Sequence, residues 1–86
     1  MLHFYDVGGR LVRRWVPGQR RVTLEVWSGD GWAPFPDVDR VSRHGHRIAD
    51  AEALPLLHAT RRRAGTFPDL SDEDARAALH ARQRRA

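Results

Sequence analysis

The residues best suited to chemistry in this chain are five arginines that share one stretch without an acid. No acidic residue lies between Asp6 and Glu25. A guanidinium is planar and grips phosphate or carboxylate with two parallel hydrogen bonds. The stretch therefore indicates an anionic partner, and its arginines are Arg10, Arg13, Arg14, Arg20 and Arg21.

The choice of arginine over lysine carries less information than the placement of the charges. All 15 basic residues are arginine, and the chain has neither lysine nor asparagine. These shortages are typical of a GC-rich coding sequence, since lysine and asparagine need A/T-rich codons. A GC-rich genome encodes arginine at positions where another genome would encode lysine.

Four of the five arginines flank the predicted turn at Pro17 and Gly18. Pairing the two strands brings these cations close together, because cross-strand neighbours lie about 5 Å apart. Like charges at that spacing are destabilising, so the cluster calls for an anion from within the protein or from outside.

The register of this hairpin is not determined by the sequence. Leu11 and Trp15 would form one apolar face, and Val12 and Val16 would form an equally good one. Whether Arg13 or Arg14 faces solvent is therefore left open at this point.

Two interpretations of the arginine hairpin follow. In one, the arginines contact a phosphate backbone while Trp15 or Trp27 stacks on a base. In the other, they form a solvated strand edge and pair with Glu25, Asp37 or Asp39, which is the commoner role of a charged run.

Trp27 and Trp32 flank the loop at 28–31 and are expected to lie across from one another. They could form an exposed aromatic contact for a partner. The favoured interpretation is a second core beneath the helices, because a small domain rarely leaves large aromatic side chains bare.

Other candidate sites are weak. His44 and His46 resemble a metal pair, but the remaining histidines are scattered singly. Ser28, Ser42 and Ser71 lie in no recognisable nucleophile motif. The arginines at 61–63 follow from the favourable position of cations at a helix carboxyl end. We therefore expect neither an enzyme, a metal site nor a cofactor.

Apolar alternation and turn residues predict four antiparallel strands, at 2–5, 11–16, 21–27 and 32–35. Capping residues predict helices at 37–45, 50–65 and 71–85, begun by Asp37, Asp50 and Ser71. Pro55 requires either a kink in the second helix or a late start. The fold class is therefore α+β, a four-stranded meander followed by two or three helices on one face.

Length and composition are those of an ordinary globular domain. Eighty-six residues make a single domain, 1–86, and 41% hydrophobic with 30% charged residues argues against disorder. The core is small, so a homodimer is plausible. No cysteine, export signal or long apolar run is present, so a cytoplasmic protein without a membrane segment is expected.

Two functions remain. The first is a small non-enzymatic nucleic-acid-binding protein that contacts phosphates through the arginine hairpin. The alternative is a protein–protein interaction module or accessory subunit, which would dock an acidic partner or a second copy through the tryptophan face and the last helix. The net charge of +4 permits the first without requiring it.

Overall fold

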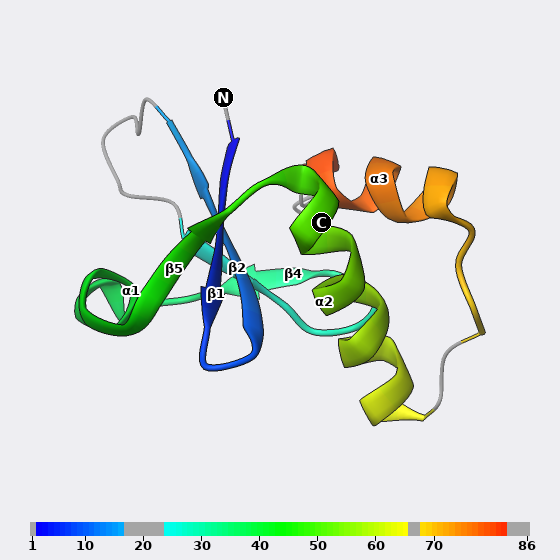
Figure 1. Ribbon diagram of the computed structural model, residues 1–86, viewed down its shortest axis with the longest axis horizontal. Coiled ribbons are helices and arrows are strands. Elements are labelled where there is room, and N and C mark those ends of the chain that lie inside the picture. The colour runs from blue at the N-terminus through cyan, green and yellow to red at the C-terminus, as the bar shows by residue number, and fades with distance from the viewer. Residues whose placement is uncertain (1, 17–23, 66–67, 83–86) are drawn as a thin grey trace.

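A computed structural model describes residues 2–16, 24–65 and 68–82 as one antiparallel sheet with three helices (Figure 1). The predicted α+β class is confirmed. In chain order the elements are β1 (Leu2–Val7), β2 (Arg10–Trp15), β3 (Leu24–Trp27), β4 (Trp32–Pro34), α1 (Val38–His44), β5 (Gly45–Ile48), α2 (Asp50–Ala64) and α3 (Asp72–His80).

The sheet has five strands in the order β4-β3-β2-β1-β5, and each neighbouring pair is antiparallel. The first four strands form the predicted meander. The fifth strand was not predicted, because its four residues have no apolar alternation and follow directly on α1. It forms by pairing with β1, with Tyr5 opposite Arg47.

The register determines which side chains share a face. Phe4 lies opposite Arg13, and Arg13 lies opposite Glu25. Since successive side chains alternate between faces, His3 and Arg14 occupy the other side of the same strands. We call the side of Arg13 the inner face and the side of Arg14 the outer face.

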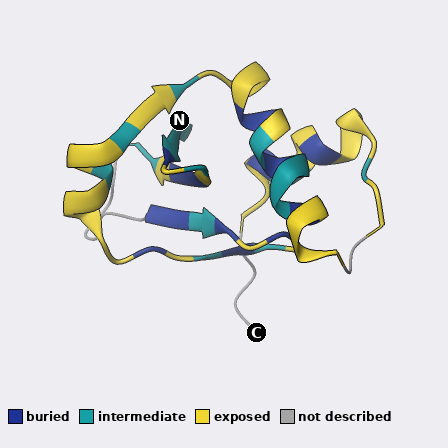
Figure 2. Ribbon diagram, turned by 60° about the horizontal axis from the view of Figure 1, so that its bottom comes forward, coloured by how far each residue is buried: buried dark blue, intermediate teal, exposed yellow. Residues whose placement is uncertain are grey.

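Helices α2 and α3 cover the inner face, as Figures 1 and 2 show. Most of the core lies there, and its buried members are Phe4, Leu11, Trp27, Trp32, Ala53, Leu54, Leu57, Ala75 and Leu79. Helix α1 lies instead on the outer face, where Val41 packs on a smaller cluster of Val7, Val12, Leu24 and Phe35. Two helices thus cover one face, within the prediction of two or three, and α1 lies on the other face.

The helix ends follow their capping residues. The Asp37 carboxylate accepts from the Arg40 amide, and the Ser71 hydroxyl accepts from the Asp74 amide, as predicted. Helix α2 differs, because Asp50 is its first helical residue and Ala49 precedes it; Glu52 accepts from the Ala49 amide instead. Pro55 lies inside this helix, so the late start, one of the two alternatives for Pro55, is wrong.

Candidate anion-binding face

Arg13 is fully buried on the inner face, and its guanidinium is satisfied within the protein. Its Nε donates to Glu25 Oε1 at 2.9 Å. Its Nη1 donates to the carbonyl of Leu79 at 2.7 Å, and its Nη2 donates to the carbonyl of Ala81 at 2.6 Å. All three nitrogens of Arg13 are therefore occupied, and none is available to a ligand.

Aromatic rings enclose this guanidinium. Its carbon lies 4.0 Å from the centroid of the Trp32 ring and 5.1 Å from that of Trp15. Trp15 Nε1 donates to the same Glu25 oxygen at 2.9 Å. Desolvation lowers the pKa of Arg13, and the bond and charge of Glu25 oppose that shift. The arginine stays charged, because its ordinary pKa lies far above neutral pH.

Arg13 binds backbone carbonyls at the carboxyl end of helix α3. The last carbonyls of a helix lack partners within it and carry the negative end of its dipole. Arg13 supplies a cation to two carbonyls at this end, and Trp32 Nε1 donates to a third, that of Ala78, at 2.8 Å. Arg13 thus acts as a structural residue that attaches α3 to the sheet.

The three candidate tryptophans also lie on the inner face. Trp27 and Trp32 are buried with ring centroids 5.2 Å apart, and Trp27 Nε1 donates to the carbonyl of Leu57. Trp15 is half-buried, and the Arg82 guanidinium lies 4.4 Å from its ring centroid. The structure therefore places Trp27 and Trp32 in the core, with only about 5–6% of either residue exposed.

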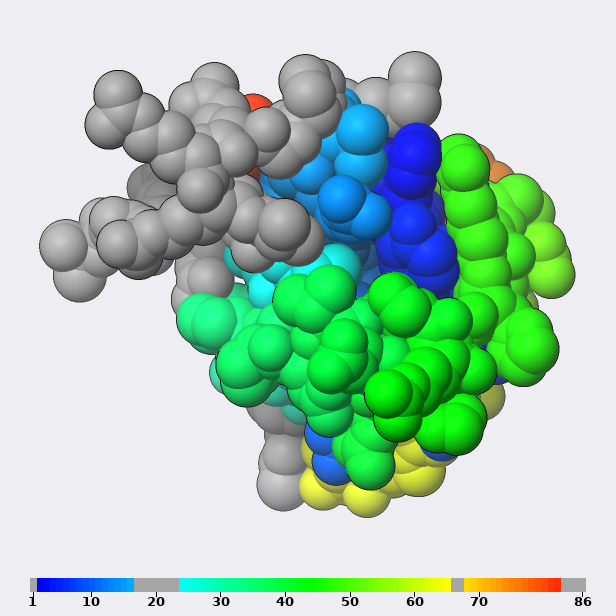
Figure 3. Space-filling model, turned by 90° about the vertical axis from the view of Figure 1, so that its left-hand side faces the viewer, coloured from blue at the N-terminus to red at the C-terminus, as the bar shows by residue number. Residues whose placement is uncertain are grey.

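Arg14 lies on the outer face and is exposed. It is opposite His3, and on the neighbouring strand pair Arg47 is opposite Tyr5. These four side chains share one side of β2, β1 and β5, and we call them the outer patch. Figure 3 shows this side, with β1 in dark blue beside the lighter blue β2 and the green α1 below them.

The outer patch contains no carboxylate. Within the described residues, none of the ion pairs involves Arg14 or Arg47. The strand positions that share this face are likewise free of acids; they are His3, Tyr5, Val7, Arg10, Val12, Arg14, Leu24, Val26, Ala33, Gly45 and Arg47. The nearest helix, α1, contributes Asp39 but also Arg40, Arg43 and His44.

The electrostatic effect of this arrangement falls on His3. Partial burial lowers the pKa of its imidazole, and the positive charges of Arg47 and Arg14 lower it further. At neutral pH His3 is therefore uncharged, although it lies beside two permanent cations. An anion that binds here would relieve this repulsion and favour protonation of His3.

The five arginines of the acid-free stretch thus have different environments. Arg13 is buried, Arg14 belongs to the outer patch, and Arg10 is exposed near the β1–β2 turn. Arg20 and Arg21 lie outside the described residues. Of the two arginines of the predicted hairpin cluster that the structure describes, Arg13 is buried and Arg14 is exposed.

Sequence reasoning missed the neighbours of Arg14 in the outer patch. His3 and Tyr5 belong to the strand predicted at 2–5, and Arg47 lies between the helices predicted at 37–45 and 50–65, where no element was predicted. Only the pairing of β5 with β1 places Arg47 beside Tyr5. The alternation of His3 and Tyr5 with Phe4 was the one local signal that these two side chains share a face.

Among the residues that the structure describes, no group of three or more histidine, cysteine, aspartate or glutamate side chains is placed to hold a metal ion. None of the helices in that part combines the length and apolar character needed to cross a bilayer. No family model, curated protein or solved structure matches this chain. The geometry of the outer patch is therefore the basis for a function.

Proposed function

We propose that the protein binds single-stranded nucleic acid through the outer patch. Arg14 and Arg47 would contact phosphates, and Tyr5 would stack on a base between them. The observation that supports this most is the register, because it gathers two arginines and a histidine around an aromatic ring, with no carboxylate among the described strand positions of that face. This is the combination by which sheet-based modules hold unpaired bases.

The spacing suits a flexible strand. Directly opposite side chains lie about 5 Å apart and diagonal ones about 7–8 Å apart. His3 lies opposite Arg14 and diagonal to Arg47, so the two arginines are on either side of β1, on the order of 12 Å apart. A single strand can adjust its backbone to cations at such intervals. A patch that spans three strands of a five-stranded sheet is poorly shaped for a major groove of about 12 Å, which suits a helix or a two-stranded ribbon.

Tyr5 supplies the sequence-tolerant part of the contact. It is half-buried, and it packs against the Val7 and Val12 cluster. This packing holds the ring in place, so little side-chain entropy is lost when a base stacks on it. Stacking of this kind accepts every base, since each has an aromatic face.

The test is a titration of labelled oligothymidylate and oligouridylate by fluorescence anisotropy at several salt concentrations. If Arg14 and Arg47 each neutralise one phosphate, each adds about −0.7 to the slope of log K against log salt. Arg14→Gln and Arg47→Gln should each weaken binding about tenfold at low salt and make the slope shallower by that amount.

Arg76→Gln is the matched control, because Arg76 is an exposed arginine of α3 on the other side of the sheet. It removes the same charge and should leave both affinity and slope nearly unchanged. Equal losses in all three variants would mean that the protein attracts polyanions by net charge alone. Full affinity in the Arg14→Gln and Arg47→Gln variants would reject the outer patch as the binding site.

A further inference from the structure

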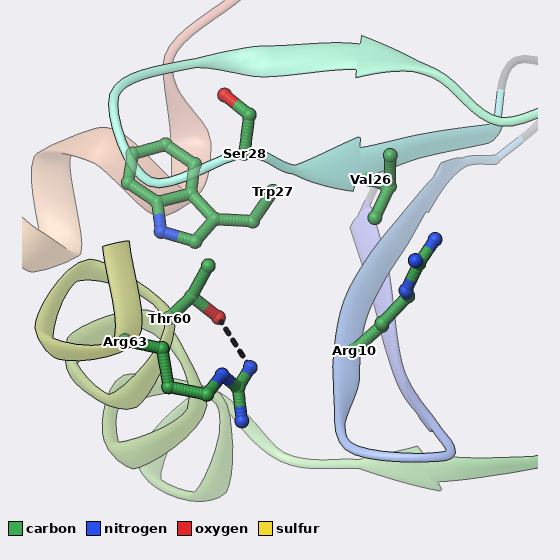
Figure 4. Close-up of a pocket in the computed structure, with 6 residues that line it drawn as sticks. All are labelled: Arg10, Val26, Trp27, Ser28, Thr60 and Arg63. Atoms are coloured by element: carbon green, nitrogen blue, oxygen red, sulfur yellow. Dashed lines mark hydrogen bonds between the residues drawn. The ribbon is translucent and has the colours of Figure 1, made fainter. Parts of the chain in front are cut away.

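A second cationic site lies at the opposite end of β2, between the sheet and the end of α2. It is a groove of about 360 Å³ lined by Arg10, Val26, Trp27, Ser28, Thr60 and Arg63 (Figure 4). Arg63 extends from α2 toward β2, whereas the guanidinium of Arg10 lies on the side of β2 where Val26 lies and is directed away from Arg63. Two arginines from elements far apart in the sequence therefore line one space.

Neither guanidinium is neutralised by the protein. Across residues 2–16, 24–65 and 68–82, the ion pairs include neither Arg10 nor Arg63. Arg63 Nη2 donates to Thr60 Oγ1 at 3.3 Å. The Thr60 hydroxyl in turn donates to the Leu56 carbonyl at 2.9 Å, so its lone pair faces Arg63. This chain of bonds holds the Arg63 side chain along the groove, and no other side-chain hydrogen bond of Arg63 is formed with the described residues.

The acids of the adjoining turns have partners of their own. The Asp30 carboxylate accepts from the Ser28 hydroxyl at 2.9 Å, and the Asp6 carboxylate accepts from the Gly9 amide at 2.8 Å. Each carboxylate thereby stabilises its own turn. Both turns border the strand ends at which the groove lies, yet their acids leave its two cations uncompensated.

We propose that this groove binds the phosphate group of a small organic phosphate. Arg63 would bind the phosphate oxygens, and the exposed Arg10 side chain would turn toward them and add a second guanidinium. Val26 and the accessible edge of Trp27 would contact the organic part. The volume lies near the lower end of the range for small-molecule sites, about 300–1,000 Å³, which suits a mononucleotide-sized ligand.

The inference does not depend on the proposed function. Arg10 is the first residue of β2, and Arg14 is four residues along the same strand. At about 3.4 Å per residue the two lie about 14 Å apart, with the buried Val12 between them. A phosphate in the groove could come from a free ester or from a nucleic-acid strand, and the chemistry of recognition is the same for both.

The experiment is a titration of the ¹⁵N-labelled protein with inorganic phosphate, adenosine monophosphate and short oligothymidylate, followed by NMR. The indole Nε1–H of Trp27 and the arginine Nε–H signals report the groove. Adenosine monophosphate should shift these signals at lower concentration than inorganic phosphate does, because Val26 and Trp27 add apolar contact. Arg10→Gln and Arg63→Gln should each weaken this binding about tenfold.

Arg62→Gln is the matched control, since Arg62 is the exposed neighbour of Arg63 on the same helix and does not line the groove. It should bind adenosine monophosphate as the unmodified protein does. Arg14→Gln should also leave this binding intact, which separates the groove from the outer patch. If only oligothymidylate shifts the Trp27 signal, the phosphate belongs to a nucleic-acid strand and no free ester is bound.

Two outcomes would overturn the proposal. One is an affinity for adenosine monophosphate that neither Arg10→Gln nor Arg63→Gln changes. The other is an equal loss in Arg62→Gln, which would mean that binding follows total charge and not the groove. Backbone amide spectra of each variant establish that it is folded, so that a loss of binding reports on the site.

Discussion

Arg13 and Arg14 are consecutive residues of one type on one strand, and the structure gives them opposite roles. Arg13 is buried on the inner face and bonded to Glu25 and to the carbonyls of Leu79 and Ala81. Arg14 is exposed on the outer face beside His3. Because successive side chains of a strand point to opposite faces, Arg13 is buried in the core and Arg14 is exposed to a ligand.

Because Arg13 is buried and only Arg14 is exposed, the number of arginines overstates the positive charge available to a partner. Arg61 is a second buried arginine, and it donates to the carbonyls of Gly29 and Pro68. Each buried arginine joins segments that are distant in the sequence through main-chain acceptors. The positive charge at the surface therefore depends on which arginines are buried, and the amino-acid composition does not show which ones these are.

The sharpest test of the comparison is to truncate each arginine in turn. Arg13→Ala should destabilise the fold by about 3–5 kcal/mol, because Glu25 would keep a buried charge without its cation and two carbonyls would lose their donor. That is a large share of a total stability of about 5–15 kcal/mol. Urea denaturation followed by circular dichroism measures it.

Arg14→Ala is the control, and its cost should stay within about 0.5 kcal/mol. Arg13→Met combined with Glu25→Gln should recover part of the loss, since it removes both buried charges together and keeps most of the volume. Equal costs for Arg13→Ala and Arg14→Ala would break the contrast between the two faces.

The sequence predicted the α+β class, the four-stranded meander and the caps of α1 and α3, because those depend on local signals such as Ser71 and the turn glycines. It did not predict β5, whose residues Gly45–Ile48 gain their conformation from pairing with β1. Nor could it assign Arg13 and Arg14 to faces, since Val12 and Leu11 are equally apolar. The outer patch depends on both of these non-local facts.

Aromatic residues extend the comparison, because Tyr5 lies on the outer face and Trp32 on the inner. Tyr5→Leu should keep the packing on Val7 and Val12 but remove the stacking surface. We expect oligothymidylate binding to fall about tenfold, within the range of about 1–3 kcal/mol for one stacked base. Anisotropy titration measures it.

Trp32→Leu should behave in the opposite way. It removes a ring beside the Arg13 guanidinium and the donor to the Ala78 carbonyl, so it should lower the unfolding free energy. At a temperature where the variant stays folded, its oligothymidylate affinity should be preserved. A Tyr5→Leu variant with unchanged affinity would leave the phosphate contacts of the outer patch without a stacking partner.

The two ends of α3 give a smaller test. Ser71 caps the amino end through the Asp74 amide at 3.1 Å, whereas Arg13 and Trp32 serve the carboxyl end. Ser71→Ala should cost about 1 kcal/mol, the usual value for a lost cap. Urea denaturation should therefore rank it well below Arg13→Ala. The reverse ranking would show that α3 is held mainly by its own cap and not by the inner-face arginine.

The smallest expected effect is the pH dependence of stability that arises from protonation of His3 on the outer face. The pKa of His3 is lowered in the folded protein by partial burial and by Arg47 and Arg14. Below about pH 6.5 the unfolded chain therefore binds more protons at His3 than the folded chain does, so this residue makes stability fall as pH falls. Arg14→Gln should raise the pKa of His3 toward its ordinary value and reduce that loss, which an NMR titration of the imidazole measures.

Nucleic-acid binding should shift the pKa of His3 in the opposite direction, upward. A phosphate beside His3 would raise its pKa, so binding takes up a proton and the affinity rises a few-fold as pH falls through about 6.5. His3→Gln should flatten that dependence while leaving the salt slope at neutral pH intact, because His3 is uncharged there. A pH dependence that persists unchanged in His3→Gln would place the responsible proton elsewhere and separate His3 from the phosphate contacts of Arg14 and Arg47.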